Sequence, residues 1–300
     1  MMIMNQAIKI GARGSELAQV QVRWVGNILQ SAGMKLHSTI IKTHGDTVLD
    51  KPLSELGRQG VFTKEIEDAL FRREIDLAVH SFKDVAIERP KGLEIVAITK
   101  REDPADLLIV HKSEFDPNGD VFPLKEGAVI GTSAIRRARQ LLALRNNITV
   151  KDLRGNVPTR LKKLSNNEYS AIFLAAAGVS RLGLDLSDFK VERLEPSAFI
   201  PSPGQGALAI EMRKDDDRGE AVRELLNDDL TARAAQIERS VLAKMGGGCS
   251  LPLGAYAEYD DEIWSLHCFW GGDISNPLWR SASGTDSGKL ISTVIASLNV

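Results

Sequence analysis

Strand-like and helix-like segments alternate along the first half of this chain, and this alternation restricts its fold more than any other feature. The first series has strand patterns at residues 7–12, 36–43, 75–81 and 93–98, with helical spacing at 15–33 and 62–73. Such a βαβ series predicts a mainly parallel sheet that binds ligands at the carboxyl ends of its strands. Ser15 is the expected N-cap of the first helix and Gly33 its expected stop.

A second series of the same kind begins after residues 103–110. Its strand patterns lie at residues 128–133, 148–153 and 170–178, and its helical patterns at 134–145 and 159–167. Residues 200–213 then read as a turn followed by a returning strand. Two similar α/β halves joined by crossing strands predict a hinged fold of two lobes with a cleft between them.

The pattern changes after the long helical stretch at residues 216–245. Residues 255–271 alternate as an antiparallel hairpin does, and residues 287–300 form a closing helical pattern. A third, small α+β domain is therefore expected at the C-terminal end.

Charge and cysteine content exclude several classes of function. The net charge of the 300 residues is −2, so no overall field attracts nucleic acid or an anionic membrane surface. The two cysteines have no zinc-site spacing and give no disulfide framework. We find no signal peptide and no apolar run long enough for a membrane span. These features predict a cytoplasmic protein with no nucleic-acid or membrane partner.

Arginines occupy an unfavourable place in the segment GTSAIRRARQ. With Ser133 as the expected N-cap, Arg136, Arg137 and Arg139 fall in the first two turns of the following helix, where the helix dipole disfavours cations. A single arginine there would point into solvent. Two adjacent ones favour a bound anion, held by backbone N–H groups and guanidinium groups together.

Further arginines are expected near strand ends. Arg13 lies between the first strand and its helix, Arg154 and Arg160 bracket LRGNVPTR, and Arg181 follows LAAAGVS. In a nearly neutral chain, this set indicates a ligand with several carboxylates or phosphates.

The segment AVHSFKDV ends a buried strand in polar residues. His80, Ser81, Lys83 and Asp84 follow one another where a parallel sheet exposes its ligand-binding edge. His80, like His44, is more often a satisfied structural group in such a position. A carboxylate among so many arginines is the expected general acid and stabiliser of a positive intermediate, so we assign that role to Asp84.

Cys249 follows three glycines in AKMGGGCSLPLG. Gly246, Gly247 and Gly248 permit positive φ angles and the close approach of a bulky group. Taken alone, this stretch favours a tight turn with a small, inert, buried cysteine.

Motifs throughout the chain resemble those of the porphobilinogen deaminase family, also called hydroxymethylbilane synthase. In family order they are GARGSELA, GD…LD, FTKEIEDAL, AVHSFKD, REDPAD, GTSAIRR, LRGNVPTRL, IFLAAAGVSRLGL, GQGALAIE and GGGCSLPLG. The resemblance implies two lobes like those of periplasmic binding proteins, with mixed, mainly parallel sheets, plus a small α+β domain. The expected domains are residues 1–103 with 206–226, residues 104–205, and residues 227–300.

The resemblance also implies chemistry. Cys249 would attach one dipyrromethane cofactor through a thioether, and four porphobilinogen molecules would be joined stepwise into hydroxymethylbilane with release of ammonia. Asp84, Lys83 and Arg13 would be catalytic, with Asp84 bonding pyrrole N–H groups and stabilising an azafulvene-like cation. The cofactor would be held by Ser81, Lys83, Asp84, Ser133, Arg136, Arg137, Arg154 and Gly155. The substrate would be held by Arg13, Ser15, Arg154, Arg160, Arg181 and Gln205. No metal is implied, and a monomer is expected.

One departure from the family pattern concerns a loop position that usually holds lysine. Here the chain reads LGRQGVF, with Gln59 at that position and Arg58 beside it. We hypothesise that Arg58 supplies the missing charge, so Arg58→Ala should lower turnover.

Two other classes of function remain alternatives. A non-catalytic two-lobed binding protein for a polycarboxylate would use the same arginines, but it leaves Asp84 and Cys249 unexplained. A nucleic-acid-binding protein would need aromatic residues among the basic ones, and aromatics make up only 5% of the chain.

Overall fold

The computed structural model describes residues 7–43, 63–119, 121–248 and 251–298. The chain divides into two compact units. Unit 1 combines Met1–Glu102 with Gly206–Arg233, and unit 2 combines Asp103–Gln205 with Ala234–Val300. The finer division into three domains that the sequence suggests stays a prediction.

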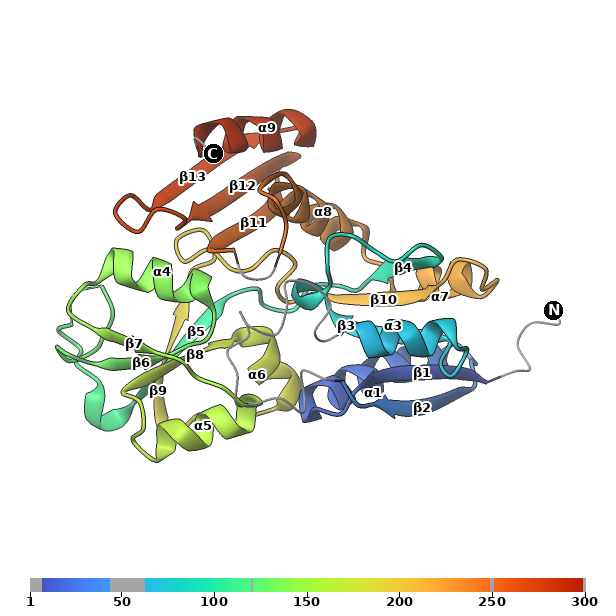
Figure 1. Ribbon diagram of the computed structural model, residues 1–300, viewed down its shortest axis with the longest axis horizontal. Helices are drawn as coiled ribbons and strands as arrows, with labels where there is room; N and C mark the ends of the chain where they lie inside the picture. The colour runs from blue at the N-terminus through green and yellow to red at the C-terminus, as the bar shows by residue number, and fades with distance from the viewer. Residues whose placement is uncertain (1–6, 44–62, 120, 249–250, 299–300) are drawn as a thin grey trace. The chain divides into compact units, whose positions relative to one another are not determined.

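Unit 1 contains a mixed sheet of five strands in the order β2-β1-β3-β10-β4 (Figure 1). Strand β1 pairs in parallel with β2 and β3, whereas β10 is antiparallel to β3 and β4. The carboxyl ends of β1 and β3 therefore lie at the same edge of the sheet. The strands are β1 (Ile8–Arg13), β2 (Leu36–Ile41), β3 (Leu77–Ser81), β4 (Leu93–Ile98) and β10 (Leu208–Arg213).

Helices cover both faces of this sheet. One face carries α1 (Glu16–Ser31) and α7 (Gly219–Leu226), and the other carries α3 (Lys64–Phe71). Successive side chains of β10 point to opposite faces of the sheet. Leu208, Ile210 and Met212 therefore lie on one face, where they share a hydrophobic core with α1 and α7. Ser15 is the N-cap of α1 and accepts a hydrogen bond from Ala18 N, as predicted, and Gly33 follows the helix end with a φ of 87°.

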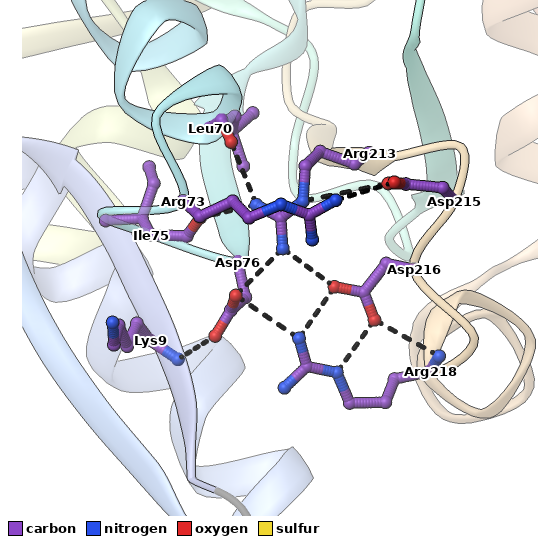
Figure 2. Close-up of polar contacts among 9 residues, drawn as sticks. All are labelled: Lys9, Leu70, Arg73, Ile75, Asp76, Arg213, Asp215, Asp216 and Arg218. Carbon is purple, nitrogen blue, oxygen red and sulfur yellow. Dashed lines mark hydrogen bonds and ion pairs between the residues drawn. The ribbon is translucent and has the colours of Figure 1, made fainter.

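A network of charged side chains fixes the opposite edge of the sheet (Figure 2). Arg213, at the carboxyl end of β10, donates to Asp76 and Asp216 at 2.9 and 3.0 Å and to the carbonyls of Leu70 and Ile75. Arg218 binds Asp216 at 2.6 Å and lies 3.3 Å from Asp76. We call Asp76, Arg213, Asp216 and Arg218 the basal network.

Unit 2 contains a second sheet with the same arrangement, in the order β7-β6-β8-β5-β9. Strand β6 is parallel to β7 and β8, and β5 is antiparallel to β8 and β9. The fourth strand of each sheet, β10 in the first and β5 in the second, thus runs antiparallel to both of its neighbours. The strands are β5 (Asp106–His111), β6 (Val129–Gly131), β7 (Thr149–Lys151), β8 (Ala171–Ala175) and β9 (Phe189–Leu194). The sequence did not predict β9.

The helices of this part correct one prediction. Residues 170–178 were expected to be one strand, but β8 ends at Ala175 and α6 (Ala176–Leu182) begins there. The alanine-rich run satisfies a strand and a helix equally well, so hydrophobicity alone does not mark the boundary. The other helices are α4 (Ile135–Leu144) and α5 (Val157–Ser165), which begins after the N-cap Asn156.

The C-terminal part of unit 2 is a three-stranded antiparallel sheet with helices against it. The sheet has the order β11-β12-β13, formed by β11 (Leu253–Asp260), β12 (Ile263–Trp270) and β13 (Leu278–Gly284). Helices α8 (Asp229–Lys244) and α9 (Ser287–Ser297) supply Ile237, Val241 and Val294 to its core. Two α/β sheets and a separate α+β part confirm the predicted fold class, although β13 was not foreseen. No helix among the described residues is long and apolar enough to cross a bilayer.

Candidate active site

The edge at which β1 and β3 end carries several of the predicted residues. Arg13 is the last residue of β1, Ser81 is the last residue of the neighbouring β3, and Ser15 is the N-cap of α1, which follows β1. All three are half-buried. The hydroxyl of Ser81 accepts a hydrogen bond from Nε2 of Gln21 at 3.1 Å. Gln21 is a buried residue of α1 that the sequence reasoning did not identify, because an amide on a helix carries no motif of its own.

Lys83 and Asp84 lie immediately beyond Ser81, in the 3₁₀ turn Phe82–Asp84. Buried Phe82 and Val85 anchor the turn, and Phe82 N donates to Ala207 O at 3.0 Å. Both Lys83 and Asp84 are half-buried. No hydrogen bond or ion pair joins the Asp84 carboxylate to any residue that the structure describes. A half-buried carboxylate that no described residue binds can accept hydrogen bonds from a ligand and balance a positive charge.

Arg136 and Arg137 occupy the first turn of α4, as predicted, but both side chains are buried against Asp106. Arg136 Nη2 donates to Asp106 Oδ2 at 2.8 Å, and Arg137 Nη2 donates to Asp106 Oδ1 at 2.7 Å. Arg136 also binds Ile200 O and Ser202 Oγ. The chain itself thus supplies an anion for the two cations, and whether they also reach the cofactor stays a prediction.

Asp106 is the centre of this cluster, and the sequence reasoning missed it. It is fully buried at the start of β5. Burial alone would raise the pKa of its carboxyl, but the adjacent guanidinium groups of Arg136 and Arg137 outweigh that effect and hold the pKa well below its usual range. Gln205, a predicted substrate residue, is also fully buried, and its Nε2 donates to Asp106 Oδ1 and Pro104 O at 2.8 Å.

The predicted capping role of Ser133 is wrong. The N-cap of α4 is Ala134, which has no side-chain capping bond, and the Ser133 hydroxyl donates to Leu153 O at 3.0 Å. Ser133 instead links the turn after β6 to the turn after β7. Its predicted contact with the cofactor is not affected and stays a prediction.

The remaining predicted arginines of unit 2 lie near the carboxyl ends of β7 and β8. Arg154 follows β7. Arg160 lies in α5 and donates a hydrogen bond of 2.8 Å to Gly155 O. Both arginines are half-buried. Gly155 has a φ of 115°, which only glycine adopts readily. Arg181 lies in the last turn of α6 and not directly at a strand end.

The glycines before Cys249 confirm the backbone prediction. Gly246, Gly247 and Gly248 have φ angles of 92°, 65° and 113°, so all three occupy the left-handed region. Cys268, the other cysteine, lies in the core of the C-terminal sheet. Burial raises the pKa of its thiol, with a further contribution from Glu238, so this thiol does not form the reactive thiolate.

One observation bears on whether unit 2 could hold an anionic cofactor. The buried Nε of Arg137 has no hydrogen-bond partner within the described part of the chain. Such an orphaned donor, next to the guanidinium group of Arg136 on the shared Asp106, fits a group that carries carboxylates. Four predicted positions, Cys249, Arg58, Gln59 and His44, lie outside the described residues.

Comparisons with known proteins agree with this arrangement. The family model "Porphobilinogen deaminase, dipyromethane cofactor binding domain" matches residues 8–221, and "Porphobilinogen deaminase, C-terminal domain" matches residues 232–276. A porphobilinogen deaminase of Bacillus velezensis is 46% identical over 258 residues, covering 85% of this chain and 80% of that protein.

A further relative and one solved structure are also similar to this chain. A probable porphobilinogen deaminase of Methanocella arvoryzae is 44% identical over 257 residues, or 85% of this chain and 82% of that protein. A solved periplasmic binding protein of Salmonella typhimurium is similar at 12% identity and a TM-score of 0.40, covering 81% of this chain and 99% of that one. The family models and the relatives together show that this chain belongs to the porphobilinogen deaminase family.

Proposed function

We propose that this chain joins four porphobilinogen molecules head to tail into the linear tetrapyrrole hydroxymethylbilane, releasing four molecules of ammonia and taking up one water for the terminal hydroxyl group. Dipyrromethane serves as the primer, with Cys249 as its attachment point. The observation that carries this proposal is the Asp84 carboxylate, half-buried and without a partner among the described residues, in the 3₁₀ turn after β3 of a chain in this family. The buried, high-pKa thiol of Cys268 is unsuited to hold the primer, which leaves Cys249 of the two cysteines.

Asp84 would act on the substrate in two ways. When the carbon–nitrogen bond of porphobilinogen breaks, ammonia leaves with the bonding electron pair, and the substrate is left with a positive charge over its ring. The Asp84 carboxylate would accept a hydrogen bond from the pyrrole N–H and stabilise that charge. It would then accept the proton released when the new carbon–carbon bond forms.

The cationic residues would hold the carboxylates of substrate and cofactor. Arg13, Ser15, Arg154, Arg160, Arg181 and Gln205 are the proposed substrate residues. Ser81, Lys83, Asp84, Ser133, Arg136, Arg137, Arg154 and Gly155 are the proposed cofactor residues. When bound, dipyrromethane supplies the free pyrrole carbon to which the first substrate is joined. Arginine suits this task because its guanidinium binds a carboxylate with two parallel hydrogen bonds.

The setting of the reaction follows from the composition. We propose that the protein works in the cytoplasm as a monomer, with porphobilinogen and the growing oligopyrrole as its partners. The absence of a disulfide framework in a sequence with two cysteines supports a reducing compartment.

The test is the conversion of porphobilinogen by the purified holoenzyme, with ammonia and tetrapyrrole measured together. Asp84→Asn keeps the size of the side chain and should lower turnover by about 10²–10⁴-fold. Asp68→Asn is the matched control, since Asp68 is a half-buried carboxylate of α3 in the same unit. Full activity of Asp84→Asn, or no ammonia release by the parent protein, would refute the proposal.

A further inference from the structure

Glu211 of β10 is a fully buried carboxylate that the proposed chemistry does not use. Its Oε2 lies 3.0 Å from Nε2 of His80, and its Oε1 accepts a hydrogen bond from Nη2 of Arg89. Because an ionised carboxylate can only accept, the His80 nitrogen is the donor. One buried carboxylate therefore binds two donors from the same stretch of chain.

His80 and Arg89 bracket the segment that contains Ser81, Lys83 and Asp84. His80 is the residue before Ser81 in β3, and Arg89 lies beyond the 3₁₀ turn, in the connection to β4. Through His80 and Arg89, Glu211 thus binds both ends of this segment to the neighbouring strand β10. The register supports this closure, since Leu208 of β10 pairs with Ser81 and Ala209 with His80.

A second carboxylate holds Arg89 from the other side. Arg89 Nη1 lies 3.1 Å from Glu67 Oε1, and Glu67 is a buried residue of α3. Arg89 consequently bridges the sheet and the helix that covers this face. Four side chains from β3, α3, β10 and the segment after the 3₁₀ turn form one cluster, which we call the Glu211 clamp: Glu67, His80, Arg89 and Glu211.

Stability alone does not account for such a cluster. Removing charges from water costs about as much as their mutual attraction returns, so buried ion pairs add little to stability compared with apolar packing. Burial would raise the pKa of Glu211, but hydrogen bonding and charge from His80 and Arg89 lower it below its ordinary value. What the clamp does provide is a fixed geometry for the turn between its two donors.

We propose that Glu211 is a positioning residue for the reaction, because its bonds to His80 and Arg89 fix where the turn presents Asp84 to the substrate. This inference rests on the proposed role of Asp84. A carboxylate that must meet a developing charge loses much of its effect when it is displaced by a fraction of an ångström to an ångström. Glu211 itself does not touch the substrate.

The test compares two isosteric variants of buried carboxylates in the holoenzyme. Glu211→Gln keeps the shape but places an amide N–H₂ against one of the two donors, so one end of the segment is released. We expect kcat to fall about 10- to 100-fold, with the KM for porphobilinogen and the cofactor content from intact mass unchanged. Asp216→Asn is the control: Asp216 is a buried carboxylate of the basal network, close to the far end of β10 (Figure 2). It should lower the melting temperature without changing kcat.

Arg89→Gln provides a second variant in case Glu211→Gln fails to fold. Arg89 is less deeply buried than Glu211, and its loss releases only the later end of the segment, so kcat should fall by a smaller factor. Equal kcat values for the clamp variants and Asp216→Asn, at matched folded fractions, would overturn the inference while the parent remains active. An inactive parent protein would instead overturn the proposed function, and the inference with it.

Discussion

Arg136 Nη2 donates a hydrogen bond of 2.8 Å to Oδ2 of Asp106, and both side chains are buried. Removing the negative charge leaves Arg136 and Arg137 buried without their counter-ion. We therefore expect Asp106→Asn to lower the free energy of unfolding by about 3–5 kcal/mol. Urea denaturation of the parent and the variant measures this difference.

The control for that experiment is an ion pair of similar geometry but greater exposure. Arg193 binds Asp103 through two hydrogen bonds of 2.7 and 2.9 Å, with the arginine about half exposed. Because solvent screens this pair, Asp103→Asn should cost about 1 kcal/mol or less. Equal losses for the two variants would show that burial does not govern the Asp106 cluster.

Several buried or half-buried carboxylates make the protein sensitive to acid. Burial opposes ionisation of Asp76 and Asp216, but hydrogen bonds from the backbone and from Arg213 and Arg218 dominate and lower their pKa values. Each carboxyl then binds protons more readily in the unfolded chain. The free energy of unfolding should therefore be constant near neutral pH and should decrease as the pH falls below about 4.

This acid sensitivity has a specific signature in the variant Asp216→Asn. The variant lacks one carboxyl group whose pKa is lowered in the folded protein, so unfolding takes up fewer protons. The free energy of unfolding should therefore decrease less steeply in acid than it does in the parent. Chemical denaturation at a series of pH values gives both curves. An identical slope would mean that Asp216 does not contribute to the linkage.

Gly206 lies directly against the backbone of Glu102. Its φ is 94°, and a Cβ atom at this position would lie 2.3 Å from Glu102 O. Gly33 has a similar φ of 87° with open space around it. Gly33→Ala should cost about 1–2 kcal/mol for the backbone conformation alone, and Gly206→Ala should cost clearly more. Equal melting temperatures for the two variants would contradict the proposed clash.

Local patterns predicted most elements of this fold. The helical spacing after Ser15 and the alternation in residues 255–271 gave α1 and the β11–β12 hairpin correctly. Strands β9 and β13 were missed because their side chains are mostly exposed or half-buried, so they lack the apolar alternation that marks a strand.

The site was predictable where residues share a motif and not where they meet only in space. Ser81, Lys83 and Asp84 were found together because they are adjacent in the chain. The sequence predicted a bound ligand anion beside Arg136, but it did not predict the Asp106 carboxylate that lies there, because Asp106 is 30 residues earlier, in β5. Glu211 is separated from His80 by 131 residues, and only the pairing of β10 with β3 brings them together.

The most direct test of this account is the intact mass of three purified proteins: the parent, Cys249→Ser and Cys268→Ser. The account predicts the added mass of two pyrrole units on the parent and on Cys268→Ser, with a colour reaction from a pyrrole-specific aldehyde reagent. Cys249→Ser should show neither. An unmodified parent from cells that make porphobilinogen, or loss of the added mass in Cys268→Ser alone, would contradict the assignment of the cofactor to Cys249.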